Sequence, residues 1–316
     1  MGKSKVILSW SLLLVSFILI ALFSLHRVVD TDIWWHLKTG EYIVKERRLI
    51  TEDIFSYTAL DQSGEGIELW LLPQWLSQVL LYSFYLVAGI PGLVLLKTAV
   101  LLASFAILYL TGQRSANRTV LAGCLLFAAF TTHNWFSLRP YVFSLLFLTL
   151  DFYILETYRS GRKGLVYLLP FVQIVWANMH QGHVVGMVLI SCYILGELLS
   201  LSRLIRSSEP MVREGYLRLL LFGGLALLGG LLSFSTPKVL LMLTGLLKGE
   251  ATERPFSMIA EWVSPFSPQM EYLELSFYKL MIGISALSFA LNFRRPQVSL
   301  FLTWAAFLLL SVTAHR

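Results

Sequence analysis

Long apolar runs separated by short polar segments dominate the pattern along this chain. Nine of the runs are close to about 20 residues, the length that crosses a bilayer as an α-helix. They cover residues 6–25, 91–111, 119–136, 140–158, 164–179, 183–202, 216–234, 275–293 and 297–313. The pattern therefore predicts an all-α, polytopic transmembrane bundle of about nine spans, folded as a single transmembrane domain over residues 1–316.

Composition supports a membrane protein. The chain is 56% hydrophobic and 14% charged, with a mean hydropathy of +0.69, whereas soluble domains carry about 25% charged residues. The net charge of +6 does not indicate a nucleic-acid partner, because the basic residues form short clusters between apolar runs. Cys124 and Cys192 lie inside such runs and are expected to be buried hydrophobes.

The basic clusters predict the orientation of the chain. They lie at residues 3–5, 114–118, 159–163, 203–218 and 294–295, and cytoplasmic loops are rich in Lys and Arg. We therefore expect a multi-pass inner or plasma membrane protein with a cytoplasmic N-terminus. The first run has the basic flank of a secretory signal, but it is long enough to span and no cleavage site follows it, which favours an uncleaved signal-anchor. Residues 26–69 and 235–274 become the first and second outer loops.

Segment 70–88 must not cross the membrane if every basic cluster is cytoplasmic. Its polar stripe of Gln74, Ser77 and Gln78 beside apolar residues suits a helix that lies at the interface. In the alternative, residues 70–111 form a hairpin of two spans that turns at residues 89–92, and every later segment is inverted. The basic clusters favour the single crossing.

The first outer loop opens with two carboxylates, Asp30 and Asp32, directly beyond the first span. Such a pair can bind a divalent cation or act as a general base, or it can simply solvate the start of a loop. We expect both to be solvent-reachable, so that changing either to Asn leaves folding intact. Trp34 and Trp35 are suited to anchoring at the headgroups or to stacking on a sugar or lipid head.

Other predicted outer segments place polar groups at the ends of spans. Arg139 precedes Pro140 at the top of a span, where a guanidinium can grip phosphate or extend to the lipid headgroups. Asn178, His180 and His183 lie between two spans; hydrogen bonding to a substrate or a satisfied turn is favoured over zinc, since no third ligand follows at metal spacing. Inside the spans, Lys97, Asp151 and Glu197 form either a proton or ion pathway or, as we favour, structural contacts.

These blocks together resemble a known superfamily. They are Asp30-x-Asp32-x-Trp34-Trp35-His36-Leu37-x-Thr39-Gly40, Asp53-x-Phe55-Ser56-x-Thr58, Gln74-Trp75-Leu76, Arg139-Pro140, Trp176-x-Asn178-x-His180-x-Gly182, Pro237, Glu261-Trp262 and Arg316. The chain is similar, over nearly its whole length, to a bacterial branch of the glycosyltransferase C superfamily, whose members are multi-span enzymes that use polyprenyl-phosphate-linked sugars.

The resemblance implies a membrane glycosyltransferase that acts at the outer face of the membrane on a polyprenyl-phosphate-linked sugar. It implies Asp30 or Asp32 as catalytic base or metal ligand, with Asp32 as the candidate ligand of a divalent cation. The expected substrate-binding residues are Trp34, Trp35, His36, Arg139, Asn178, His180, Lys238, Glu261 and Arg316. Similar proteins usually continue past Arg316, so an inactive membrane assembly subunit is one alternative, and a multi-span transporter is the other.

Overall fold

The structure, a computed structural model, describes residues 3–28, 30–50, 55, 74–202, 211–232, 266, 273–294 and 297–313. Within these ranges every regular element is a helix and no strand occurs, which confirms the predicted all-α class. The α-helices are α1 (Lys3–Ser24), α2 (Asp32–Glu46), α3 (Trp75–Gly112), α4 (Arg118–Thr132), α5 (Tyr141–Arg159), α6 (Leu169–Met179), α7 (His183–Leu201), α8 (Arg213–Leu231), α10 (Leu273–Leu291) and α11 (Val298–Thr313), with 3₁₀ turns η2 (His133–Trp135) and η3 (Lys163–Leu168).

Five of the described helices are long and apolar enough to cross a membrane. They cover Val6–Ser24, Trp75–Gly112, Tyr141–Arg159, His183–Leu201 and Arg213–Leu231, and three shorter apolar helices cover Gly164–Met179, Leu275–Leu291 and Val298–Val312. The predicted multi-pass architecture is thus supported in its coarse form. The number of about nine spans stays a prediction, because several of the expected apolar runs form helices that are shorter than a bilayer requires.

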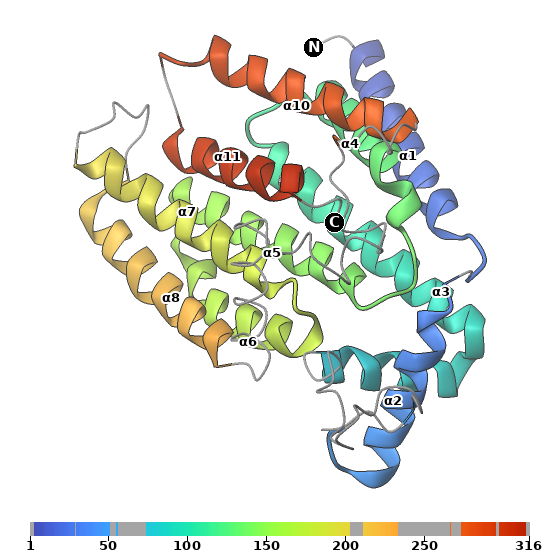
Figure 1. The fold of residues 1–316 in the computed structure, drawn as a ribbon. Helices are drawn as coiled ribbons and strands as arrows, with labels where there is room; N and C mark the ends of the chain where they lie inside the picture. The colour runs from blue at the N-terminus through green and yellow to red at the C-terminus, as the bar shows by residue number, and fades with distance from the viewer. Residues whose placement is uncertain are drawn as a thin grey trace.

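Helix α3 is two helical parts joined by a kink at Gly89. The φ of Gly89 is 58° and its ψ is −153°, a conformation that side-chain-bearing residues rarely adopt. Pro91 follows in the next turn, where its ring cannot donate a helical hydrogen bond. In Figure 1 the first part of α3 (residues 75–88) lies beside α2, and after the kink the second part runs back through the bundle. A kink at this position is compatible with both the single crossing and the hairpin that turns at residues 89–92, so the choice between them stays a prediction.

Contacts between helix termini define two ends of the bundle. At one end, here called the α2 end, α1 and α4 terminate, α5 and α7 begin, and α2 packs on the first part of α3 (Figure 1). At the opposite end, Arg114 at the end of α3 donates to Thr157 near the end of α5, with Nη1 and Oγ1 2.7 Å apart. Arg118, at the start of α4, lies 4.0 Å from the ring centroid of Trp10 in α1.

This second end, here called the basic end, gathers five of the described arginines that follow or precede apolar helices. They are Arg114, Arg118, Arg159, Arg213 and Arg218. Arg139, which precedes α5, lies at the α2 end instead, and which of the two ends faces outward stays a prediction.

Candidate active site

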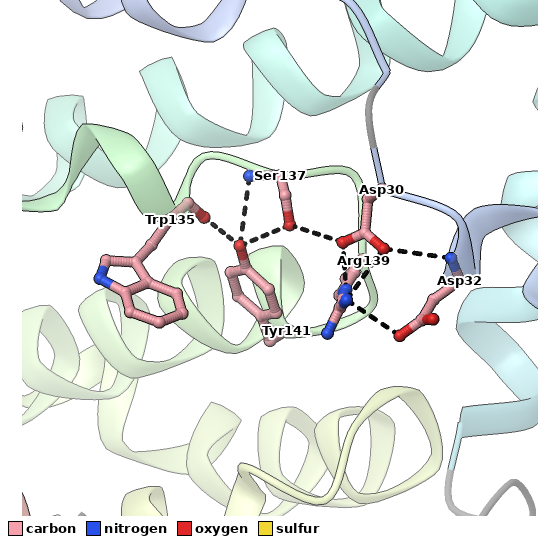
Figure 2. A network of polar contacts seen from close by, with 6 residues as sticks. All are labelled: Asp30, Asp32, Trp135, Ser137, Arg139 and Tyr141. Atoms are coloured by element: carbon pink, nitrogen blue, oxygen red, sulfur yellow. Dashed lines mark hydrogen bonds and ion pairs between the residues drawn. The ribbon is translucent and has the colours of Figure 1, made fainter. Parts of the chain in front are cut away.

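Arg139 lies between the two acidic residues that the sequence singles out (Figure 2). Its Nη2 donates to Asp30 Oδ1 at 2.9 Å, and its Nε donates to Asp30 Oδ2, so the guanidinium grips this carboxylate with two nitrogens. The same Nη2 lies 3.0 Å from Asp32 Oδ2. Residues more than 100 positions apart in the chain therefore form one charged cluster, located where α1 has ended and α5 is about to begin.

Asp30 is also held by neutral donors. The backbone N–H of Asp32 donates to Asp30 Oδ1 at 3.1 Å, which satisfies a free N–H in the first turn of α2. The Ser137 hydroxyl donates to Asp30 Oδ2 at 3.2 Å and lies 2.8 Å from the Tyr141 hydroxyl. Tyr141 in turn donates to the Trp135 carbonyl. Sequence reasoning missed Ser137 and Tyr141, whose spacing from Arg139 carries no motif.

These contacts keep Asp30 ionised. Burial alone would raise the pKa of its carboxyl, but the hydrogen bonds from Arg139 and the Asp32 backbone, with the charge of Arg139, hold the pKa below its ordinary value. A carboxylate with a lowered pKa and both oxygens engaged is a poor proton acceptor. Asp30 is therefore better suited to orienting Arg139 than to general-base catalysis.

The two carboxylates differ in exposure. The side chain of Asp32 is 54% exposed, whereas that of Asp30 is 10% exposed. The expectation that both are solvent-reachable suits Asp32 well, whereas Asp30 is largely covered and lines an open pocket. Asp32 makes one side-chain contact, to Arg139, which leaves it the more available base of the pair.

Helix α2 presents one face to the protein and one to the surroundings. Its buried residues are Ile33, His36, Leu37, Thr39 and Gly40, the i, i+3, i+4, i+7 spacing of an amphipathic helix. Gly40 makes this packing possible, because a Cβ there would stand 2.2 Å from the backbone oxygen of Gln78 in α3. Trp34 is 55% exposed, which suits its expected role in stacking or anchoring. The ring of Trp35 contacts Phe55, with centroids 5.6 Å apart.

His36 lies on the buried face, so a direct substrate contact does not fit its position. Its Nδ1 is 3.3 Å from Gln78 Nε2. Burial and, secondly, the charge of Arg139 lower the pKa of His36 to about 4. A neutral His36 therefore packs behind the charged cluster at physiological pH.

The connection between α6 and α7 reaches the same end of the bundle. Asn178 Oδ1 accepts from Trp75 Nε1 at 2.8 Å, which ties α6 to the start of α3. His180 Nδ1 accepts from the Gly182 backbone N–H at 3.0 Å and lies 2.7 Å from Ser144 Oγ in the first turn of α5. Because Nδ1 is an acceptor, a neutral His180 bears its proton on Nε2.

An open pocket adjoins the charged cluster. It has a volume of about 480 Å³ and is lined by His26, Val28, Asp30, Thr31, His133, Asn134, Ser137, Leu138 and Arg139. The volume falls in the range of about 300–1,000 Å³ typical of small-molecule sites. Most of the lining side chains can donate or accept hydrogen bonds, and Asp32 lies outside the lining, next to the Asp30–Arg139 pair.

The described residues do not fit a tightly bound divalent cation. No group of three or more His, Cys, Asp or Glu side chains occurs within the described ranges. Both oxygens of Asp30 face Arg139 and one oxygen of Asp32 does so as well, so a cation between the carboxylates would meet the guanidinium charge. Among the described residues, Arg139 is the cation that contacts both carboxylates.

Three of the expected substrate-binding residues, Lys238, Glu261 and Arg316, lie outside the described residues. The three ionisable groups that the sequence singled out inside the spans, Lys97, Asp151 and Glu197, are buried. Asp151 accepts from Gln173 Nε2 at 2.8 Å, and Glu197 accepts from Ser299 Oγ at 2.9 Å and from the Met211 backbone at 3.3 Å. The carboxylate of Glu197 thus joins α7 to the segment before α8 and to α11, which favours a structural role for this residue.

Comparison of the chain with protein-family models, with curated proteins and with solved structures finds no match. The function is therefore argued from the site.

Proposed function

We propose that the protein is a membrane glycosyltransferase that moves a sugar from a polyprenyl-phosphate carrier to an acceptor hydroxyl at the outer face of the membrane. The observation that carries the proposal is the meeting of Asp30, Asp32 and Arg139 beside an open pocket at one end of an apolar helical bundle. A donor with a long apolar tail keeps that tail in the bilayer, so its phosphate must react at a helix end such as this one.

The proposed reaction uses each group once. Asp32 takes the proton of the acceptor hydroxyl, and the acceptor oxygen forms a bond to the anomeric carbon of the sugar. The bond from that carbon to the phosphate oxygen breaks, and its electron pair leaves with the phosphate. The guanidinium of Arg139 stabilises the charge that develops there, while Asp30 orients the guanidinium.

The pocket suits the polar head of the donor. Its lining offers hydroxyl, amide and imidazole groups from Thr31, Ser137, Asn134, His26 and His133, and such groups bind sugar hydroxyls. Asn178 and His180 lie at the same end of the bundle but outside the lining of the pocket, and Trp34 is exposed on α2.

The test is release of the carrier. Purified protein in nanodiscs is incubated with a panel of short-chain polyprenyl-phosphate sugars, and free polyprenyl phosphate is measured by mass spectrometry. We expect release from at least one donor by the wild type, and a loss of about 100-fold or more in Asp32→Asn, the size of a general-base contribution. Absence of release from every donor, with or without added acceptor alcohols, would contradict the proposal.

The transporter alternative predicts a different result. Loss of function would then follow neutralisation of Asp151 or Glu197 and not of Asp32, since intramembrane carboxylates mark transport pathways. Radiolabelled-sugar uptake into proteoliposomes by the Asp32→Asn variant would favour that alternative.

A further inference from the structure

Arg139 Nη2 is shared by two carboxylates. It lies 2.9 Å from Asp30 Oδ1 and 3.0 Å from Asp32 Oδ2 (Figure 2). The phosphate of the proposed donor would need the same face of the guanidinium, because a fork of parallel N–H groups is what binds phosphate oxygens. An arriving phosphate therefore competes with one of the two carboxylates.

Asp30 is the carboxylate that stays. It holds two nitrogens of Arg139, and it also accepts from Ser137 Oγ and from the backbone of Asp32. With a side chain that is 10% exposed, losing its partner would leave a nearly buried charge unpaired, which is costly.

Asp32 is the carboxylate that leaves. Its side chain is 54% exposed and touches Arg139 with a single oxygen. An exposed ion pair of this kind contributes little free energy, and water solvates the carboxylate once it is released.

We infer that Asp32 is a latch on Arg139 that the phosphate of the substrate opens. In the unliganded state the guanidinium holds one oxygen of Asp32. When the phosphate binds Arg139, Asp32 is displaced and becomes free to accept the acceptor's proton. This inference rests on the proposed function for its meaning, since it makes the base available only when the donor is in place.

The first experiment is binding of a short-chain polyprenyl phosphate, without sugar, to purified protein. Asp32→Asn removes the competitor, so we expect binding up to about fivefold tighter, the factor that an exposed ion pair is worth. The matched control is Glu41→Gln, which removes one negative charge from the same helix at a residue that pairs with Lys38 and Lys45 instead. If the two variants tightened binding equally, general charge repulsion would explain the effect, and the latch would be overturned.

The second experiment measures release of Asp32 directly. Carboxyl labelling with a water-soluble carbodiimide and an amine is followed by mass spectrometry, with and without sulfate, a tetrahedral dianion that shares the charge and shape of phosphate. Sodium chloride at equal ionic strength is the control, because screening alone loosens exposed pairs. We expect sulfate to raise labelling of Asp32 several-fold and to leave Asp30 protected.

The outcomes separate the two proposals. Unchanged or reduced labelling of Asp32 under conditions where polyprenyl phosphate binds would overturn the latch and leave the glycosyltransferase proposal standing. Increased labelling of Asp32 in a protein that releases carrier from no donor would uphold the latch and contradict the glycosyltransferase proposal.

Discussion

Asp30 and Asp32 stand two positions apart in the chain, yet their surroundings give them different tasks. Asp30 is enclosed by Arg139, Ser137 and the start of α2, whereas Asp32 faces outward from the first turn of that helix. A sequence pattern of two acidic residues cannot separate these surroundings, because the side chains that enclose Asp30, Ser137 and Arg139, come from a segment more than 100 residues later.

Stability should separate the two residues. Asp30→Asn leaves Arg139 without its main partner, and we expect a loss of about 1–3 kcal/mol, less than for a fully buried pair. Asp32→Asn should change stability by no more than about 0.5 kcal/mol, as for most exposed positions. Thermal unfolding followed by tryptophan fluorescence in detergent measures both, and equal melting temperatures for the two variants would contradict the assignment.

His36 should make stability depend on pH. Its folded pKa of about 4 lies below the ordinary value of about 6.5, so the unfolded chain binds a proton at a higher pH than the folded protein does. Stability is therefore lost as pH falls from about 6.5 toward 4, by up to roughly 3 kcal/mol. His36→Gln should flatten the melting temperature over this window. The contribution of Asp30, whose pKa is lowered, is lost only below about pH 4, so the two effects occupy different ranges.

Helix α2 is the element that sets the geometry of the site, since it begins at Asp32 and packs on α3 through Gly40. Its apolar spacing could have placed His36 on the buried face, because residues 33, 36, 37 and 40 follow a helical period. The resemblance to the glycosyltransferase C superfamily instead implied a substrate contact for His36. The hydrogen bond between Trp75 and Asn178 could not be predicted in this way, since it joins two helices whose packing the sequence does not reveal.

Gly40→Ala tests the contact between α2 and α3. The added Cβ would stand 2.2 Å from the Gln78 oxygen, so the helices must separate, at a cost of about 1–3 kcal/mol. Gly123→Ala in α4 is the matched control, because a Cβ there meets no atom within 4 Å and alanine favours a helix by up to about 1 kcal/mol. A Gly40→Ala variant as stable as the control would show that the two helices do not pack this closely.

At the scale of the whole molecule, five of the described arginines beside apolar helices gather at the basic end, whereas Arg139 lies at the α2 end. Which end faces outward stays a prediction. The lengths of the apolar runs predicted the all-α class correctly. They also predicted about nine spans, whereas five of the described helices are long and apolar enough to cross a membrane. The sequence divided segment 70–88 from the span 91–111, and the kink of α3 at Gly89 falls between them.

Topology can be measured with single cysteines. In a background with Cys124 and Cys192 replaced, a membrane-impermeant maleimide applied from outside should label Lys38→Cys, on the exposed face of α2, and should not label Ser160→Cys at the basic end. Permeabilised cells provide the control in which both positions react. Labelling of position 160 and not of position 38 in intact cells would invert the orientation.

The central claim is that the Arg139 cluster binds a lipid-linked phosphate, and binding of a short-chain polyprenyl phosphate in nanodiscs tests it most directly. The variants are Arg139→Ala and Arg139→Lys, with Arg114→Ala as the matched control, since Arg114 also ends a helix but donates to Thr157 and Tyr153 at the basic end. We expect binding by the wild type and Arg114→Ala, weaker binding by Arg139→Lys because lysine lacks the fork, and the largest loss in Arg139→Ala. Binding by Arg139→Ala at wild-type strength, or no binding by the wild type, would contradict the account.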